Sequence, residues 1–521
     1  MERWLDVNRT FTAGALFALT LGLVGLTLDD PGITWDEPAY FGSAQLQVEW
    51  VRMLLSEPSS ALNRETVFEM WDWDHYHNPH PPIYKEAMAI TWWATKDVLG
   101  HLAGYRLAPA LLFAGLVALA FRWGAAAWSG IGGLGSALSI LLMPRLFGHA
   151  HIAATETPLL VFWVAASAAG WWAVERKRRV GWLLAGVALG LAAGTKFTGL
   201  LAVMPLAAWG LWRDPRATLR GLPVAALIGV AIFWALNPML WFDPGQFLRV
   251  WFWESLHRGD YAPIATYYLG QVYTFSLPWH HVFVMTAAVM PLGILSLAGL
   301  GAAWGLRRLD PLVVLSAASV ALFWALLLLP RAPHHNGVRM FIVVFPFLGM
   351  IAGYGFHRLW GVLAIRVRQP MMAVLFLPVA AQLAWIHPLE LSYYGEAVGG
   401  VRGAHRLGLE TTYWMDACTE PVLEWMNREL PEGARVWVFG NEITLVFQQA
   451  YGRLRRDIEL RSEGPGSEWA LVVMWQGIMS PEFAEELRNT RPAYALELQG
   501  VPLVAIYRIA DPEPTGDSPD D

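Results

Sequence analysis

Two acidic residues, Asp36 and Glu37, follow the first apolar stretch of the chain directly, in the sequence Thr34-Trp35-Asp36-Glu37-Pro38. A carboxylate at the level of the lipid headgroups can act as a general base on an acceptor hydroxyl, whose proton is too weakly acidic to leave unaided. The simpler alternative is a solvated pair at a membrane surface. We take Asp36 and Glu37 as candidate catalytic residues.

A lysine and a histidine mark the end of the first long polar segment, in His80-Pro81-Pro82-Ile83-Tyr84-Lys85. The prolines can start a helix with Lys85 in its first turn, where its ammonium group could bind a lipid-linked phosphate. The alternative is a lysine that snorkels toward lipid headgroups. Five residues of this segment could also ligate a divalent ion, although their spacing matches no recognised metal motif: Asp72, Asp74, His75, His77 and His80.

Three further residues lie at the ends of apolar stretches. Glu156 follows His149 and precedes Pro158, so it could bind a metal ion together with Asp36 and His149, or it could simply favour a helix N-terminus. Lys196 and Arg339 each precede an apolar stretch, as phosphate ligands or as interface anchors. The candidate donor-phosphate ligands are therefore Lys85, Lys196 and Arg339, and the candidate metal or acceptor ligands are Glu156, His149 and His80.

The elements that must position these residues are membrane helices. Of the 521 residues 55% are hydrophobic and 15% are charged, which excludes an ordinary soluble protein. The single cysteine, Cys418, excludes a disulfide framework. Apolar stretches long enough to cross a bilayer predict about eleven transmembrane helices, near residues 11–28, 107–127, 130–145, 157–174, 181–194, 196–212, 221–240, 283–304, 311–329, 339–356 and 371–387.

The charges predict the topology. Residues 1–388 carry a balance of +5 and the rest a balance of −11. Short basic connections near residues 175–179, 213–220, 307–310 and 358–368 are cytoplasmic by the positive-inside rule, which places the N-terminus in the cytoplasm and the C-terminal part outside. The cytoplasmic connections are too short for a nucleotide-binding domain, so no nucleotide and no nucleic acid is expected.

The C-terminal part has the pattern of a small extracytoplasmic α/β domain over residues 389–510. Helices are predicted at 420–430 and 481–489, and strands at 435–439, 470–474, 493–498 and 502–508. The acidic residues 511–521 are expected to be disordered. The transmembrane domain then covers residues 1–388, with a long first outer loop at 29–106.

Four of these motifs, in this order, resemble the protein O-mannosyltransferases and the lipid A aminoarabinose transferases, which are polytopic glycosyltransferases of the GT-C superfamily. They are Asp36-Glu37, His80-Pro81-Pro82 with Lys85, Glu156 before a Pro-Leu helix start, and Gly194-Thr195-Lys196-Phe197-Thr198-Gly199. The resemblance implies a GT-C fold, a polyprenyl-phosphate sugar donor and inverting transfer to a hydroxyl on the extracytoplasmic side. It assigns the base to Asp36, metal or acceptor binding to Glu156, and the neighbourhood of the donor phosphate to Lys85.

The chain departs from the family pattern at Glu156, where aspartate is common, and it lacks the large soluble insertion of the eukaryotic O-mannosyltransferases. Metal dependence and a protein acceptor therefore stay open. We expect an inner-membrane glycosyltransferase whose acceptor is a protein, a lipid or a glycan. The alternatives are a transporter or flippase of lipid-linked glycans, and a membrane protein that binds glycans without catalysis. Internal repeats and midplane polar residues, which are typical of transporters, are not apparent in the sequence.

Overall fold

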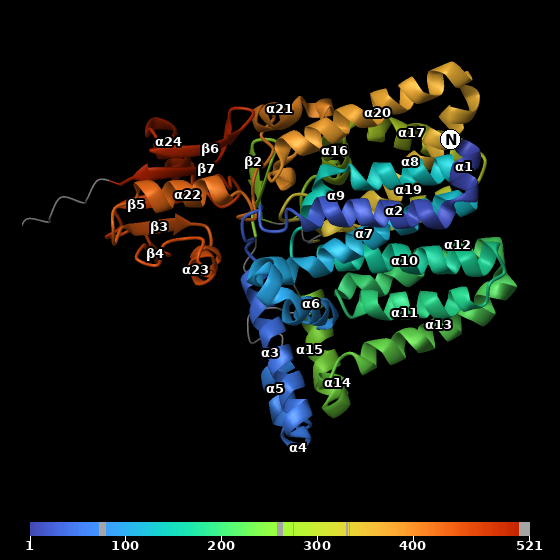
Figure 1. Cartoon of the computed structure of the whole chain (residues 1–521), viewed down its shortest axis with the longest axis horizontal. Coiled ribbons are helices and arrows are strands. Elements are labelled where there is room, and N and C mark those ends of the chain that lie inside the picture. Colours follow the sequence, from blue (N-terminus) through green and yellow to red (C-terminus); the bar gives the residue numbers. More distant parts are fainter. Residues whose placement is uncertain (72–79, 258–263, 275, 330–331, 333, 510–521) are drawn as a thin grey trace, which may run out of the picture.

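The computed structural model describes residues 1–71, 80–257, 264–274, 276–329, 332 and 334–509. Most of the chain forms a bundle of α-helices, and a small sheet domain lies at one end of this bundle (Figure 1). The bundle consists of α1 (Glu2–Val7), α2 (Arg9–Gly25), α7 (His101–Ala127), α8 (Gly130–Leu141), α9 (Pro144–His149), α10 (Glu156–Glu175), α11 (Val180–Ala193), α12 (Val203–Arg213), α13 (Pro215–Ala235), α16 (His281–Val289), α17 (Leu292–Arg307), α18 (Pro311–Leu327), α19 (Val344–Val362) and α20 (Ile365–Ile386).

Each of the eleven apolar stretches contains helix, but five of them are not one continuous α-helix. The stretches at 130–145 and 221–240 break between α8 and α9 and between α13 and α14 (Met239–Phe242). The 3-10 helices η2 (Phe197–Ala202) and η4 (Arg339–Phe341) precede α12 and α19. The stretch at 283–304 breaks into α16 and α17 before Pro291, because proline has no N–H to donate and its ring clashes with the preceding turn. Sequence hydropathy does not register such breaks, so each of these stretches was predicted as a single helix.

Four of the described helices are long and apolar enough to cross a membrane, namely α7, α10, α13 and α20. A fifth span results if α17 and α18, which meet at 115°, count as one. The helices α2, α8 and α11 are apolar but shorter. The prediction of eleven spans is therefore not confirmed by helix length, although the chain has the apolar helices of a multi-pass membrane protein.

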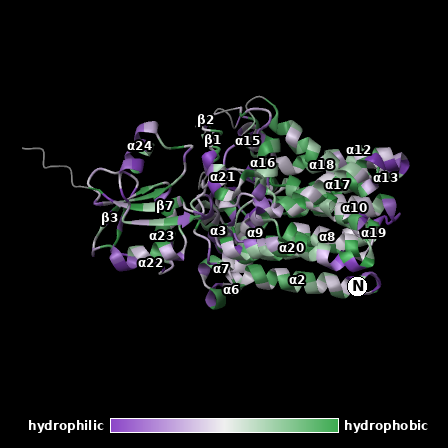
Figure 2. Ribbon diagram, turned by 90° about the horizontal axis from the view of Figure 1, so that it is seen from above, coloured by the Kyte–Doolittle hydropathy of each residue, from purple (hydrophilic) through white to green (hydrophobic). Residues whose placement is uncertain are grey.

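The two ends of the bundle differ in character. The N-terminus lies at the end opposite the sheet domain (Figure 1), and apolar residues dominate the helices between these ends (Figure 2). The basic connection after α19 also lies at the N-terminal end, because Arg368 forms an ion pair of 3.2 Å with Glu2. Exposed side chains of α13 and α20, such as Leu227 and Val374 at 72%, fit a surface that faces lipid.

The long first loop is largely helical and covers the end of the bundle beside the sheet domain. It contains α3 (Glu37–Ser56), α4 (Pro58–Ala61), α5 (Arg64–Trp71) and α6 (Ile83–Leu99). A second outer segment carries α14 (Met239–Phe242), α15 (Pro244–Leu256), β1 (Thr266–Tyr268) and β2 (Gln271–Tyr273). Trp50, Trp71 and Trp251 form a buried aromatic cluster that joins the two segments and holds the C-terminal half of α3.

The sheet domain has five strands in the order β4-β3-β5-β7-β6, in which β3 pairs parallel with β4 and β5, and β7 pairs antiparallel with β5 and β6. Its elements are α22 (Glu420–Glu429), β3 (Arg435–Phe439), α23 (Glu442–Ala450), β4 (Glu459–Arg461), β5 (Trp469–Val473), α24 (Pro481–Asn489), β6 (Tyr494–Leu498) and β7 (Val501–Arg508). The predicted helices and strands are confirmed, whereas α23 and the three-residue edge strand β4 were not predicted. Residues 511–521, predicted to be disordered, lie outside the described residues.

The chain between α20 and the sheet domain belongs to the junction rather than to either part. It contains the 3-10 helices η5 (Glu390–Ser392) and η6 (Glu396–Val398) and α21 (Gly400–Arg406). Farther on, the carbonyl groups of Trp414 and Asp416 accept hydrogen bonds of 3.0 and 2.8 Å from the amides of Trp35 and Gly32. Gly32 admits no side chain, because a Cβ would lie 2.7 Å from the carbonyl oxygen of Cys418. Residues 414–418 therefore lie directly against the turn that carries Asp36.

Candidate functional site

Arg339 is the centre of a largely buried group of charges at the end of the bundle beside the sheet domain. It begins η4, and its guanidinium group bonds to Oδ2 of Asp36, at the start of α3, and through Nε to Oε1 of Glu156 at 2.8 Å. The guanidinium also lies 4.2 Å from the ring centroid of Trp414, a cation–π contact that comes from the junction segment. Three segments far apart in the sequence thus meet at one side chain.

Lys196 completes the group from a second direction. Its ammonium lies 3.2 Å from Oε1 of Glu156, which also accepts a hydrogen bond of 2.9 Å from the hydroxyl of Thr155. The turn before Lys196 packs tightly against the start of α6, where the amide of Ile83 donates to the carbonyl of Gly194 at 3.1 Å. Two carboxylates and two cations therefore balance in charge, and we name Asp36, Glu156, Lys196 and Arg339 the charge cluster.

The charge cluster retains polar groups without partners. Within the described part of the chain, Oε2 of Glu156 and both ring nitrogens of His149 accept or donate no hydrogen bond, although both side chains are buried. Burial lowers the pKa of His149 to about 3 even though Glu156 acts in the opposite direction, so its ring is neutral at physiological pH. Buried polar groups normally find partners. Their number here indicates a site that a ligand with hydrogen-bonding groups can complete.

Asp36 is the most exposed member of the charge cluster, so solvent or substrate can reach the cluster at its carboxylate. Its side chain is 25% exposed, compared with 1% for Glu156 and 6% for Arg339. A partly exposed carboxylate beside buried cations can accept a proton from a bound hydroxyl, while the cations stabilise negative charge that grows on a leaving group.

Glu37, the second candidate catalytic residue, has a different environment. Its carboxylate is enclosed and bonds to the guanidinium of Arg106 in α7 at 2.7 and 2.8 Å. It also accepts hydrogen bonds from the amides of Thr34 and Ala153. Glu37 therefore joins the Asp36 turn to the segment that leads to Glu156, and we take it to position the site.

Lys85 and His80 flank the charge cluster. The ammonium of Lys85 donates a hydrogen bond of 3.1 Å to the carbonyl of His80, so Lys85 contacts the main chain of His80. The ring of Tyr84, in the same helical turn as Lys85, packs 4.9 Å from the ring of Tyr40, which begins the second turn of α3. Lys85 is buried beside this aromatic pair. Asp72, Asp74, His75 and His77 lie outside the described residues.

The metal site predicted between Asp36 and Glu156 does not match the geometry. The guanidinium of Arg339 occupies the position between the two carboxylates, and among the residues that the structure describes no group of three His, Cys, Asp or Glu side chains could hold a metal ion. A cation of the chain itself thus takes the bridging place that the sequence assigned to a metal ion.

Sequence reasoning missed three residues beside the site. Trp414 covers Arg339, and Arg106 holds Glu37, as described above. Arg145 in α9 donates to the hydroxyl of Tyr413 at 2.9 Å and to the carbonyl of Tyr393 at 3.1 Å. A charged residue inside or beside an apolar stretch is a signal for both arginines. Trp414 carries no such signal, because tryptophan is common near membrane surfaces.

Comparisons with known proteins bear on the family. Residues 98–242 match the family model of dolichyl-phosphate-mannose-protein mannosyltransferases. Undecaprenyl phosphate-alpha-4-amino-4-deoxy-L-arabinose arabinosyl transferase 1 of Pseudomonas fluorescens is 31% identical over 233 residues, which are 40% of this chain. That match spans 38% of the length of the relative. These two findings confirm the resemblance to both families that the motifs predicted.

Two solved structures are similar over most of their length. The crystal structure of ArnT from Cupriavidus metallidurans in the apo state aligns with 95% of this chain and 98% of that chain, at 14% identity and a TM-score of 0.49. The structure of the same protein bound to undecaprenyl phosphate aligns equally, at 15% identity and a TM-score of 0.49.

Proposed function

We propose that this protein is a membrane glycosyltransferase that moves a sugar from a polyprenyl-phosphate donor to a hydroxyl acceptor, on the extracytoplasmic side and with inversion at the anomeric carbon. The observation that carries the proposal is the charge cluster, in which an accessible carboxylate lies beside the buried Arg339 and the largely buried Lys196 at the end of an apolar helical bundle. The matches to the mannosyltransferase model and to the arabinosyl transferase support the same class of reaction.

The cations suit the leaving group. When the glycosidic bond to the donor breaks, a second negative charge develops on the phosphate, and fixed cations stabilise that charge without reorganisation. Arg339 and Lys196 are already oriented by Glu156. Lys85 could approach the same phosphate from the flanking turn. Because Arg339 fills the position between the carboxylates, we propose that it supplies the charge that a metal ion would otherwise supply.

The base is Asp36. Its bond to Arg339 holds the carboxylate in place, and a donor phosphate that competes for Arg339 would free it for the acceptor hydroxyl. A base on one side of the anomeric carbon and cations on the other fit direct displacement, which inverts the configuration. With the site on the extracytoplasmic side, we propose that the sheet domain beside it is extracytoplasmic and that the N-terminus, at the opposite end of the bundle, is cytoplasmic.

The test is a transfer assay with purified protein and radiolabelled polyprenyl-phosphate sugars. The enzyme should release polyprenyl phosphate, and activity should survive EDTA. A flippase or a glycan-binding protein would leave the donor intact, and that result would overturn the proposal.

A further inference from the structure

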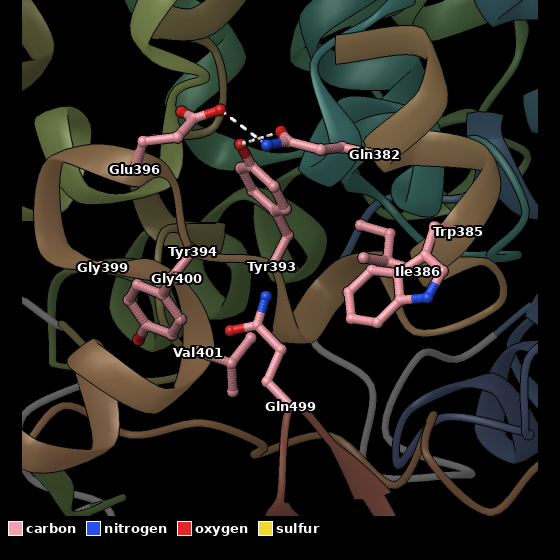
Figure 3. A pocket seen from close by; sticks show the side chains of 10 residues that line it. All are labelled: Gln382, Trp385, Ile386, Tyr393, Tyr394, Glu396, Gly399, Gly400, Val401 and Gln499. Atoms are coloured by element: carbon pink, nitrogen blue, oxygen red, sulfur yellow. Dashed lines mark hydrogen bonds between the residues drawn. The ribbon is translucent and has the colours of Figure 1, made fainter. Parts of the chain in front are cut away.

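A hollow lies apart from the charge cluster, where α20 meets the sheet domain (Figure 3). It has a volume of about 270 Å³ and lies between the end of α20, the junction segment and the turn between β6 and β7. Its walls include Gln382, Trp385, Tyr393, Glu396 and Gln499. Drug-sized ligands occupy pockets of about 300 to 1,000 Å³, so this hollow suits one small ring.

The hydrogen-bonding groups on one wall are held in place. The amide of Gln382 donates to Oε1 of Glu396 at 2.7 Å and accepts from the hydroxyl of Tyr393 at 3.2 Å (Figure 3). The second oxygen of Glu396 accepts from the amide of Leu292 at 2.9 Å. A preorganised carboxylate and amide bind a ligand at a lower entropic cost than mobile side chains do.

The opposite wall depends on unusual backbone conformations. Gln499 and Gly500 form the two-residue turn between β6 and β7, with φ of 55° and 73°. Such turns favour Asn or Gly at the first position, so glutamine there is strained. Gly400 has φ of 70°, which favours glycine, and a Cβ there would lie 2.5 Å from Oε1 of Gln499 and displace that side chain. The strained turn directs the Gln499 amide toward Tyr393 and Val401 (Figure 3).

The chemistry of the lining selects a class of ligand. The described residues that line the hollow include a carboxylate, two amides and a phenol but neither lysine nor arginine, so the lining lacks the cations that usually bind phosphate. Hydroxyl groups donate and accept, as these side chains do. Trp385 adds a large indole ring that is 61% exposed at the end of an apolar helix, close to the membrane surface.

We infer that this hollow is a binding site for a neutral sugar ring, such as the headgroup of a glycolipid or the free end of a glycan. Gln382, Glu396 and Gln499 bind the hydroxyl groups, and the face of Trp385 packs against the C–H groups of the ring. The site does not depend on the proposed transfer reaction, because none of its residues belongs to the charge cluster.

The test uses the full chain in phosphatidylcholine nanodiscs, purified without glycoside detergents. Saturation-transfer NMR with methyl β-D-glucopyranoside and methyl α-D-mannopyranoside should show transfer to the ring protons. A parallel experiment with octyl glucoside tests whether the ligand is a membrane-anchored sugar. If it is, octyl glucoside should bind at a lower concentration than the methyl glycosides do. Inorganic phosphate should not compete.

Two variants and two controls define the outcome. Trp385→Leu and Gly400→Ala should each weaken binding about tenfold, whereas Trp279→Leu, which changes another exposed tryptophan, should leave it unchanged. Asp36→Asn should retain full binding even if it abolishes transfer, which separates this site from the proposed function. The inference would be overturned if no neutral sugar showed a saturation-transfer signal, or if glucosamine bound more strongly than the glucoside. It would also be overturned if Trp279→Leu weakened sugar binding as much as Trp385→Leu does.

Discussion

Among the residues that the structure describes, two buried arginines have acidic partners, and they differ in how completely their environment satisfies them. Arg106 donates five hydrogen bonds, two to Glu37 and three to the carbonyls of Leu28, Pro31 and Gly32. Arg339 pairs with Asp36 and Glu156 and shares Glu156 with Lys196, and Glu156 keeps one oxygen without a partner in the described residues. Desolvation is compensated at the first cluster and only partly at the second.

The comparison teaches that burial of charge does not by itself mark an active site. The Arg106 cluster joins the chain after α2 to the segment that leads to Glu156, and both oxygens of Glu37 already accept hydrogen bonds within the cluster. The charge cluster around Arg339 has an accessible carboxylate and unused polar atoms. We therefore expect substitutions at Arg106 to change stability and substitutions in the charge cluster to change turnover.

The largest effect is expected from the adjacent carboxylates. Asp36→Asn should lower turnover by about 10³-fold or more, because general-base catalysis contributes about 10²- to 10⁴-fold and the amide cannot accept the proton. Its thermal midpoint should stay close to that of the wild type. Glu37→Gln is the matched control and should lose stability while its folded fraction stays active. Release of polyprenyl phosphate and thermal unfolding measure the two effects, and exchanged phenotypes would assign the base to Glu37.

The second effect concerns stability. Arg106→Met should lower the free energy of unfolding by about 3 to 5 kcal/mol, because it leaves the buried carboxylate of Glu37 without its charge partner. Arg122→Met is the control, since Arg122 lies in the same helix and makes an exposed contact of 3.2 Å with Thr10. Thermal unfolding in nanodiscs compares the two variants. An equal, small change in both would show that the Arg106 cluster does not stabilise the junction.

The third effect is a smaller change in catalysis. Lys196→Met should lower kcat/KM about 10- to 100-fold, because one of two cations that face the developing phosphate charge is lost while Arg339 still holds Glu156. Lys196→Arg should recover part of the activity. Lys177→Met, which removes an exposed pair with Asp214 at the other end of the bundle, serves as the control. Equal activity in Lys196→Met and wild type would remove Lys196 from the site.

Sequence alone predicted the helical stretches and the individual members of the charge cluster, because apolar length and charges at helix ends are local signals. It could not distinguish Asp36 from Glu37, since the difference arises from Arg106, about 70 positions away. Trp414 was missed for a similar reason: its place over Arg339 results from backbone pairing between residues 32–35 and 414–416. A bridging metal ion was one of the alternatives left open, because sequence could not show that Arg339 lies between the two carboxylates.

The smallest expected effect concerns His387, which directly follows α20. Its Nδ1 lies 2.5 Å from Glu390 and its Nε2 lies 2.9 Å from Asp30, which follows the first span. Burial alone would lower the pKa of His387, but the hydrogen bonds and charges of Glu390 and Asp30 outweigh it and raise the pKa to about 9. Protonated His387 therefore ties the first and last membrane helices together.

A pKa that is higher in the folded than in the unfolded state contributes stability at low pH. This contribution should be complete below about pH 6.5, the ordinary histidine value, and should disappear as the pH rises through about 9. We expect a loss of about 1 to 2 kcal/mol, reduced from the full linkage value because Asp30 is exposed to solvent. Thermal unfolding from pH 6 to pH 10 should show this decline in the wild type and in the exposed control His405→Gln, but not in His387→Gln. A His387→Gln profile that declines as steeply as the wild type would assign the pH dependence to other groups.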